Sequence, residues 1–552
     1  MFSKSFSFII IIFFAPFIKC SNFNLKIIHF NDLHARYDEV TNKSSPCHED
    51  SRSQPCVAGV ARLVTTINRL KRENPNHLVL NAGDVYQGTI WYTLMKWNVS
   101  QMFTNLIKAD AMVLGNHEFD DGLDGLIPFL TQTTNNTPVV ISNLNIPSSK
   151  LTNLTLMKKL VRRGPLKLKI ADHTVGVIGV IYEETHKITN TAPLKFENSA
   201  AMVKKQSKKL RKQGVNKIIV LSHCGIEEDR RMAEQVGDDI DIIVGGHSHT
   251  LLYNGKAPSK HAVYGDYPLV VQKANGHQVL IVQAYCHGHY VGNLDVTFNA
   301  NGEIVAFSGQ PVYQNGAIEK DPDIEQRVQK LKLEIQAKSA VEIGRSELEL
   351  DNNCRTGECK LGSALADAYL WHFPSSRIAL IHAGNFKSGL KKGIISKGEL
   401  LTAMPFNSNA NRMKISGSTL KAASEHGVTL NRRCAHSTLQ VSGIQVDVDF
   451  RKQPGKRAAV RVRNYNGYEP LDEGKQYEVV VNSYIVKGGD GFEMFKNATV
   501  EEWGPIDAET FERYVTEYGG LESDTVEEPR IKVANLQKAQ EEVKRCKPLS
   551  RR

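Results

Sequence analysis

The sequence predicts an α/β protein with two domains. Its 552 residues are enough for two hydrophobic cores of ordinary size. From Phe23 to about Gly316, short apolar runs alternate with polar stretches of helical spacing, which is the pattern of a layered α/β domain. Five of these runs end directly in histidine, aspartate or asparagine, so the pattern that predicts the fold also predicts a site.

The chain begins with an apolar segment that we interpret as a secretory signal peptide. Residues 1–20 contain a lysine near the start and the run FSFIIIIFFAPFI. This run is short and is followed directly by the first expected strand, which favours a cleaved signal over a membrane span. An uncleaved anchor is the alternative. We therefore expect a secreted, extracellular protein.

The five strands with polar ends read LKIIHF, HLVLNAGD, DAMVLGNHE, KIIVLSH and DIIVGGHSH. Apolar runs of this length, rich in β-branched residues, are typical of buried parallel strands. Ligands of open α/β sheets bind beyond the carboxyl ends of the strands, so we expect five strands to deliver ligands to one edge of one sheet. The candidate metal ligands are Asp32, His34, Asp84, Asn116, His223, His247 and His249.

These residue types favour a site for two metal ions. A carboxylate shared by two divalent ions, with imidazoles completing each shell, makes a site about 3.5–4 Å across. Asp84, alone after its strand, is expected to bridge the ions. Asp32, His34 and His249 would complete one shell, and Asn116, His223 and His247 the other. Imidazole with carboxylate favours zinc, manganese or iron over an all-oxygen site; we expect two divalent ions, zinc first, with manganese, calcium or magnesium as alternatives.

His117 and Asp120 are the candidate catalytic residues. His117 directly follows a predicted ligand, so its side chain is expected to point away from the metals and toward the substrate. Asp120, three residues on, could hold the other ring nitrogen and favour the protonated imidazole. The pair would stabilise the charged transition state and assist the leaving oxygen.

A purely structural origin is the alternative for each cluster taken alone. A single histidine after a strand is usually a core or turn residue, and a single aspartate there usually caps a helix. Five clusters in a fixed order after five strands favour a site instead.

One predicted helix divides the chain. Apolar residues at helical spacing in DIEQRVQKLKLEIQAKSA indicate a helix between Pro322 and Ala340. The chain then consists of a metal-binding domain at 21–318, a helical linker at 319–340, a second α/β domain at 341–530 and a basic, helical or loose tail at 531–552. The net charge of +10 favours polyanionic partners such as nucleotide phosphates, and without a nucleic-acid-binding motif we expect no nucleic-acid partner.

The order of the clusters resembles a known superfamily. The series D-x-H, G-D, G-N-H-E, H and G-H-x-H is similar to that of calcineurin-like metallophosphoesterases. The strings HFNDLHARYDEV, NAGDVYQGT, LGNHEFDDG and IVGGHSHT resemble the 5′-nucleotidase/apyrase family within it, including the secreted salivary apyrases of blood-feeding arthropods. The resemblance implies a four-layer αββα metallophosphoesterase domain, a helical linker and a C-terminal α/β domain that recognises the substrate.

The same resemblance implies substrate-binding residues in the second domain. In the family, two aromatic rings hold the nucleotide base, and the segments MPFN and KGGDGFEMF supply Phe406 and Phe492 here. Arg355 matches an arginine that contacts substrate phosphate. The family loop N-G-G-G-x-R is altered, because His382 replaces its asparagine and Lys387 its arginine, a point charge without the bidentate fork. Each of these residues, taken alone, is as readily a core or surface residue.

Eight of the nine cysteines follow the signal segment, an even number suited to an oxidising compartment. Cys47 with Cys56, and Cys354 with Cys359, are close enough in sequence to close short loops, and the family has comparable local bridges. The pairing of Cys224, Cys286, Cys434 and Cys546 is left open. Glycosylation sequons lie at Asn42, Asn98, Asn135, Asn153 and Asn497.

Three functions fit these observations. The first is an apyrase that removes terminal phosphates from extracellular ATP and ADP through a metal-activated water and so inhibits platelet aggregation. It is favoured by the altered loop, by Lys387, Lys391 and Lys392, and by the absence of the hydrophobic tail through which anchored family members are held, so we expect no membrane anchor. The second is a 5′-nucleotidase that converts AMP to adenosine. The third is a secreted binder of nucleotides or host proteins without catalysis; the oligomeric state is left open in all three.

Overall fold

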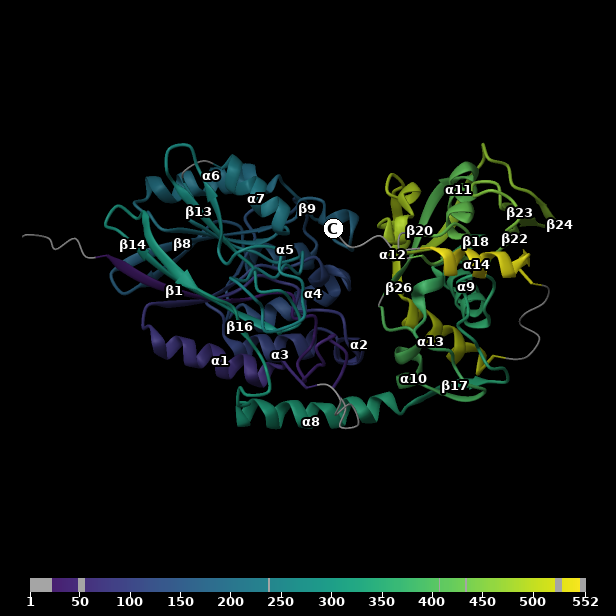
Figure 1. The fold of residues 1–552 in the computed structure, drawn as a ribbon, viewed down its shortest axis with the longest axis horizontal. Helices are drawn as coiled ribbons and strands as arrows, with labels where there is room; N and C mark the ends of the chain where they lie inside the picture. Colours follow the sequence, from purple (N-terminus) through teal and green to yellow (C-terminus); the bar gives the residue numbers. More distant parts are fainter. Residues whose placement is uncertain are drawn as a thin grey trace, which may run out of the picture.

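The computed structural model describes residues 22–47, 55–236, 239–406, 408–431, 434–521 and 529–546, and it confirms the predicted two-domain α/β fold. Figure 1 shows two lobes side by side, joined along one edge by the long helix α8 (Pro322–Ser339). Within the described ranges, no helix combines the length and the apolar character needed to cross a bilayer. The predicted signal peptide lies outside the described residues.

The first sheet of the N-terminal lobe has the order β15-β14-β1-β2-β3-β4-β6, with β16 paired to β14. Its parallel strands are β1 (Phe23–Phe30), β2 (His77–Asn81), β3 (Ala111–Met112), β4 (Val139–Val140) and β6 (Val161–Arg162). Its antiparallel strands are β14 (Tyr290–Phe298), β15 (Ile304–Gly309) and β16 (Val312–Tyr313).

The second sheet of this lobe has the order β12-β13-β11-β10-β8-β7. Its parallel centre consists of β8 (His173–Ile181), β10 (Ile218–His223), β11 (Ile242–Val244) and β13 (Gln278–Val282). The antiparallel edges are β7 (Leu166–Ile170) and β12 (Leu269–Gln272). A separate small ladder joins β5 (Leu144–Asn145) to β9 (Lys195–Phe196).

Helices cover the outer faces of both sheets, which gives four layers (Figure 1). The first sheet is covered by α1 (Val60–Glu73), α2 (Ile90–Met95), α3 (Trp97–Ile107), α4 (Gly122–Thr133) and α5 (Thr152–Leu160), and the second by α6 (Ser199–Lys212) and α7 (Ile226–Gln235). The sheets approach closely at Gly179, where a Cβ would lie 1.8 Å from the Val140 carbonyl oxygen. Only glycine fits this approach, so the contact fixes how the two sheets stack.

The prediction that five strands share one sheet is wrong. β1, β2 and β3 lie in the first sheet, whereas β10 and β11 lie in the second. These five strands are almost entirely buried, so their apolar runs look alike in the sequence and do not reveal their partners. The loops that follow them nevertheless meet at one edge of the stacked sheets, as the ligand distances given below require.

The C-terminal lobe contains two larger sheets with separate apolar clusters around them. One consists of β21 (Gln440–Ser442), β18 (Ile378–Ile381), β25 (Gln476–Asn482), β20 (Asn409–Ser416) and β26 (Val500–Ile506), and the other of β24 (Gly467–Pro470), β23 (Ala458–Asn464), β22 (Ile444–Asp449) and β27 (Ile531–Ala534). β17 (Glu342–Ser346) pairs with β19 (Gly393–Ser396). The helices are α9 (Lys360–His372), α10 (Lys397–Ala403), α11 (Gly417–Gly427), α12 (Ser483–Val486), α13 (Asp507–Tyr518) and α14 (Leu536–Arg545).

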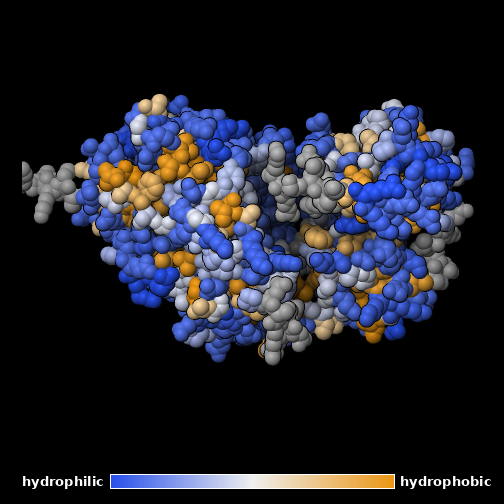
Figure 2. Space-filling view, viewed as in Figure 1, coloured by the Kyte–Doolittle hydropathy of each residue, from blue (hydrophilic) through white to orange (hydrophobic). Residues whose placement is uncertain are grey.

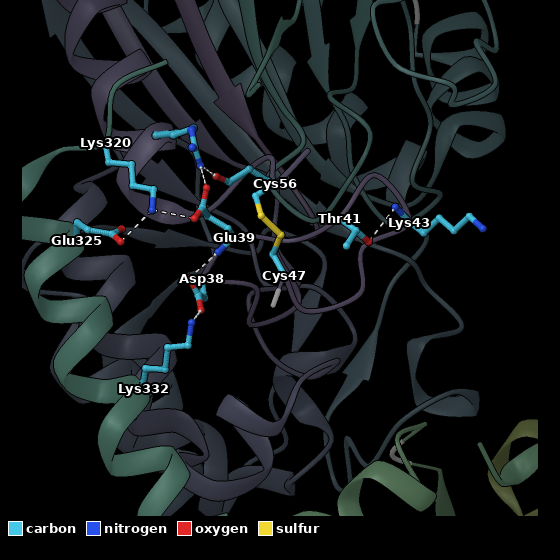
Figure 3. Close-up of a disulfide and its surroundings, with 11 residues drawn as sticks. Asp38, Glu39, Thr41, Lys43, Cys47, Cys56, Lys320, Glu325 and Lys332 are labelled. Carbon is cyan, nitrogen blue, oxygen red and sulfur yellow. Dashed lines mark hydrogen bonds and ion pairs between the residues drawn. A yellow bond between two sulfur atoms is a disulfide. The ribbon is translucent and has the colours of Figure 1, made fainter. Parts of the chain in front are cut away.

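The helix α8 belongs to the packing of the N-terminal lobe. Its apolar side contributes Val328 and Leu331 to the core of that lobe. Two lysines anchor it, as Figure 3 shows: Lys320, just before the helix, lies 2.8 Å from Glu39, and Lys332, on the helix, lies 2.8 Å from Asp38. The anchored helix therefore fixes the point from which the C-terminal lobe departs.

Three disulfides stabilise the described chain. Cys47–Cys56 and Cys354–Cys359 close the two local loops that the resemblance implied. A third bridge, Cys434–Cys546, spans 112 residues and resolves part of the pairing that the sequence left open. Cys224 and Cys286 are unpaired and buried.

The prediction of a separate tail from residue 531 is wrong for its first part. β27 (Ile531–Ala534) pairs with β22 inside the C-terminal sheet, and α14 contributes the buried Ala539 to the core. Arg457 pairs with Glu542 of the same helix. The segment contains few apolar residues, so its sequence resembles that of a surface tail. In the structure it nevertheless packs as part of the C-terminal lobe.

Candidate dimetal centre

The seven predicted ligands come together where the loops leave the strands. Asp32 and His34 follow β1, Asp84 follows β2 and Asn116 follows β3, while His223 ends β10 and both His247 and His249 follow β11. All lie at the carboxyl ends of parallel strands, as the sequence predicts.

One group of ligands consists of Asp32, His34 and His249. The Nε2 atoms of His34 and His249 are 3.0 Å apart. Asp32 Oδ1 lies 3.4 Å from His249 Nε2 and 3.8 Å from His34 Nε2. Donor atoms bound to one ion at about 2.0–2.2 Å lie about 3–4 Å from one another, so this set fits a single divalent cation.

The second group consists of Asn116, His223 and His247. Asn116 Oδ1 lies 2.8 Å from His247 Nδ1. Asp84 Oδ2 lies 3.2 Å from His223 Nε2 in this group and 3.8 Å from His34 Nε2 in the other. This position between the groups supports Asp84 as the bridging carboxylate, and we propose the seven residues as ligands of two ions.

Protein contacts orient the rings for this role. His34 Nδ1 donates to the Tyr86 carbonyl at 3.2 Å, and His223 Nδ1 donates to the Ala82 carbonyl at 2.6 Å. Each ring therefore keeps its proton on Nδ1 and offers Nε2 to the site. Such contacts to the second ring nitrogen fix the tautomer of metal-binding histidines.

The backbone at the ligands is unusual. Five of the seven lie in the left-handed region, with φ angles of 51° (Asp32), 49° (His34), 56° (Asp84), 73° (His247) and 51° (His249). This conformation is uncommon for residues other than glycine, and such residues gather at functional sites where the surrounding structure holds them. The left-handed conformations therefore favour a functional site over a cluster that forms only through packing.

His117 lies closer to the ligands than its sequence position predicts. A ring nitrogen lies within 4.8 Å of ligand atoms of His34 and Asp84, so the side chain does not point away from the metals. The cause is the start of the short 3-10 helix at His117, where its backbone N–H donates to Asp84 Oδ1 at 2.9 Å. The ring consequently lies beside the site, at its accessible side.

The predicted pair of His117 and Asp120 forms. His117 Nδ1 lies 2.6 Å from Asp120 Oδ2, and the Thr189 hydroxyl donates to Asp120 Oδ1 at 2.7 Å. Burial lowers the pKa of His117, but the charges of Asp120 and Asp84 more than offset this and raise it to about 9. We propose that the ring is held as an imidazolium that faces the reacting phosphate.

Glu118 is a functional residue that the sequence analysis missed. Its buried carboxylate accepts backbone N–H groups of Asp84 at 3.0 Å, Val85 at 2.7 Å and Gly115 at 2.5 Å. It thereby joins the loop after β2 to the loop after β3. The final letter of G-N-H-E was the available signal, and its role is to position Asp84.

The predicted substrate residues of the second lobe are only partly assembled. Arg355 lies next to the loop of His382, since a Cβ at Gly384 would be 3.7 Å from its guanidinium. His382 itself is buried, accepts from the Gly384 N–H and lies 3.2 Å from Asp490. Protein groups thus face both ring nitrogens, which favours a loop-positioning role over substrate contact. Lys387 is exposed just beyond this loop.

The two phenylalanines differ in exposure. Phe406 is 57% exposed, as a platform for a base requires. Phe492 is 0% exposed, and its ring packs on His426 at a centroid distance of 4.6 Å. In this conformation the core of the lobe therefore covers the faces of Phe492, and its role as a stacking ring stays a prediction.

Lys487 is the second residue that the sequence analysis missed. It directly follows α12, the helix on the side of the C-terminal lobe that faces the N-terminal lobe (Figure 1). The surface is hollowed between the lobes (Figure 2). The Lys487 side chain is exposed. Desolvation lowers the pKa of Lys487, and the negative charges of Asp120 and Asp84 oppose this shift. The charge of Lys487 in the second lobe is therefore complementary to those of two carboxylates in the metal-binding lobe.

Fold and donor set together define a two-domain metallophosphoesterase. Residues 25–251 match the family described as calcineurin-like phosphoesterase, and residues 323–497 match the 5′-nucleotidase C-terminal domain. The chain belongs to the 5′-nucleotidase family of these phosphoesterases, a family of metal-dependent nucleotide hydrolases.

Individual relatives cover almost the whole chain. An apyrase of Anopheles gambiae is 40% identical over 93% of this chain and 91% of its own. A 5′-nucleotidase of Bos taurus is 36% identical over 86% and 85%. The crystal structure of a 5′-nucleotidase precursor from Thermus thermophilus has a TM-score of 0.62 at 33% identity and covers 93% of this chain and 100% of that one.

Proposed function

We propose that this protein is a secreted apyrase that removes the terminal phosphate of ATP and ADP. The observation that supports the choice is Lys487, a cation of the second lobe whose charge interacts favourably with those of Asp84 and Asp120. It adds to the exposed Lys387 and Arg355 around the altered loop. A second set of cations in the C-terminal lobe suits a di- or triphosphate chain better than the single phosphate of AMP.

The chemistry divides between the ions and the chain. When bound, two divalent cations make water a nucleophile at neutral pH and counter the charge of the transferred phosphoryl group. His117 supplies a positive charge beside that group, and Asp120 with Thr189 keeps its ring in place. Arg355 and Lys387 bind the remaining phosphates, and Phe406 offers a face to the base.

The test is phosphate release from ATP, ADP and AMP measured in parallel, by protein supplied in turn with zinc, manganese, calcium and magnesium. Strong release from ATP and ADP with little from AMP is the expected result. Release mainly from AMP would favour a 5′-nucleotidase, which the relatives of that name support. No release with any ion would favour the non-catalytic binder.

Secretion and platelet inhibition belong to the same proposal. Secretion is supported by three disulfides and by sequon asparagines of which none is buried. Expression in insect cells should place the glycosylated protein in the medium. Added to platelets stimulated with ADP, it should suppress aggregation, and Asp84→Asn should abolish the effect. Suppression that survives this substitution would assign the effect to binding.

A further inference from the structure

The loop after β13 brings another histidine to the metal ligands. β13 (Gln278–Val282) is a parallel strand of the second sheet, and the chain continues as Gln-Ala-Tyr-Cys-His-Gly-His. The backbone N–H of His287 in this loop donates to the Asp32 carbonyl at 2.7 Å. His287 is thus tied directly to one of the proposed ligands.

The ring of His287 completes a group of three imidazoles. Ring nitrogens of His34, His249 and His287 all lie within 4.8 Å of one another. The ring centroid of His287 lies 5.6 Å from that of His34 and 5.4 Å from that of His249. This spacing is close to that of the proposed ligands themselves.

Two further features of His287 match those of the ligands. Its Nδ1 is 2.7 Å from the Ser44 hydroxyl, so the ring is oriented through one nitrogen and Nε2 is left for a cation. Its backbone is left-handed, with φ of 58°, as at five of the seven proposed ligands. Neither feature is needed for a histidine that only fills space.

We propose that His287 is a further ligand of the ion held by Asp32, His34 and His249. The inference rests on the proposed dimetal centre. It gives one of the two ions three imidazoles besides its carboxylates, whereas the other has two imidazoles and an amide. Such a site selects a borderline transition ion, zinc or cobalt, over calcium or magnesium.

The matched control is His289 in the same loop. Its Nε2 lies 2.9 Å from the same Ser44 hydroxyl, but it belongs to none of the groups that could hold an ion among the described residues. The variants are His287→Asn and His289→Asn, since asparagine tolerates a left-handed backbone and is too short to replace the imidazole. Circular dichroism and melting of the metal-free proteins show whether each variant folds.

The experiment strips the full-length protein of metal and titrates it with Co²⁺, followed by visible absorption and by metal content per chain. Wild type should bind two ions. His287→Asn should weaken one of the two binding steps by at least about tenfold and change the absorption spectrum, and His289→Asn should leave both unchanged.

Other outcomes are equally decisive. Equal binding by wild type and His287→Asn would overturn the inference, and so would equal weakening by both variants, which would indicate a disturbed loop. Wild type that binds fewer than two ions would overturn the dimetal centre itself. A second variant, Ser44→Ala, should weaken the same step by less than His287→Asn does.

Discussion

At the scale of single residues, the site depends on backbone as much as on side chains. Five proposed ligands and His287 adopt left-handed conformations, and the buried Glu118 fixes the loop that carries Asp84. Burial raises the pKa of Glu118 to about 7, and the nearby charge of Asp84 adds to this. The left-handed backbone and the buried Glu118 side chain therefore both cost free energy of folding, which packing of the surrounding core must offset.

His117→Ala should lower turnover by about 10²–10⁴-fold, the usual effect of removing a positioned acid or base. Metal content should stay at the wild-type level, because the two ligand groups do not include this ring. The measurements are kcat for ADP and metal per chain. Loss of an ion in this variant would instead identify His117 as a ligand, because its ring nitrogen lies within 4.8 Å of ligand atoms of His34 and Asp84.

Asp120→Asn should shift the pH profile. The Asp120 charge raises the pKa of His117, so its removal lowers that pKa and less imidazolium is present at any given pH. The alkaline fall in kcat/KM for ADP should therefore begin at lower pH than in wild type. An unchanged alkaline limb would show that His117 does not act as the charged form.

Gly115→Ala should destroy the metal site. A Cβ at this position would lie 2.0 Å from Asp84 Oδ1, so the bridging carboxylate would be displaced. We expect loss of both ions and of activity. Gly164→Ala is the control, since nothing among the described residues lies within 4 Å of its Cβ; equal metal content in both variants would contradict the bridging role.

At the scale of elements, the sequence predicts what local patterns encode. Apolar runs with polar ends located the strands β1, β2, β3, β10 and β11 and the residues that follow them. The sequence could not predict that β10 lies in a different sheet from β1, because a fully buried apolar run does not indicate which strand it pairs with. His287 was missed because it follows β13 only after a bend. The burial of Phe492 by His426 and its neighbours could not be predicted, because it is a tertiary effect.

The C-terminal segment provides a prediction at this scale. Cys434–Cys546 closes a loop of 112 residues, whereas Cys354–Cys359 closes one of five. Because the stabilisation by a disulfide grows with the loop it closes and is typically about 2–4 kcal/mol, Cys434→Ser with Cys546→Ser should lower the melting temperature more. Opening Cys354–Cys359 should instead raise KM for ADP, since it frees Arg355. Equal melting temperatures would show that α14 is held by packing alone.

At the scale of the whole molecule, α2 of the N-terminal lobe contacts the C-terminal lobe, with Ile90 and Leu94 packed against its apolar core. Lys96 lies 3.7 Å from Glu509 across the boundary, and Leu94, Trp371 and Ile506 line a cavity of about 810 Å³ nearby. None of the proposed metal ligands lines this cavity. Boundaries between domains commonly permit relative motion, and we expect the charges of the second lobe to influence how it engages a substrate held at the metals.

Lys487→Ala tests whether the second lobe takes part in this way. If its ammonium binds a phosphate of the substrate, its removal should lower kcat/KM for ADP by about tenfold, the effect of one lost charged hydrogen bond. The loss for AMP should be smaller, and metal content should not change. Lys496→Ala is the matched control, because Lys496 lies in the same segment but pairs with Glu493 there. Equal losses for ADP and AMP would make Lys487 a general contributor to the electrostatic field and would remove it as the basis for preferring the longer phosphate chain.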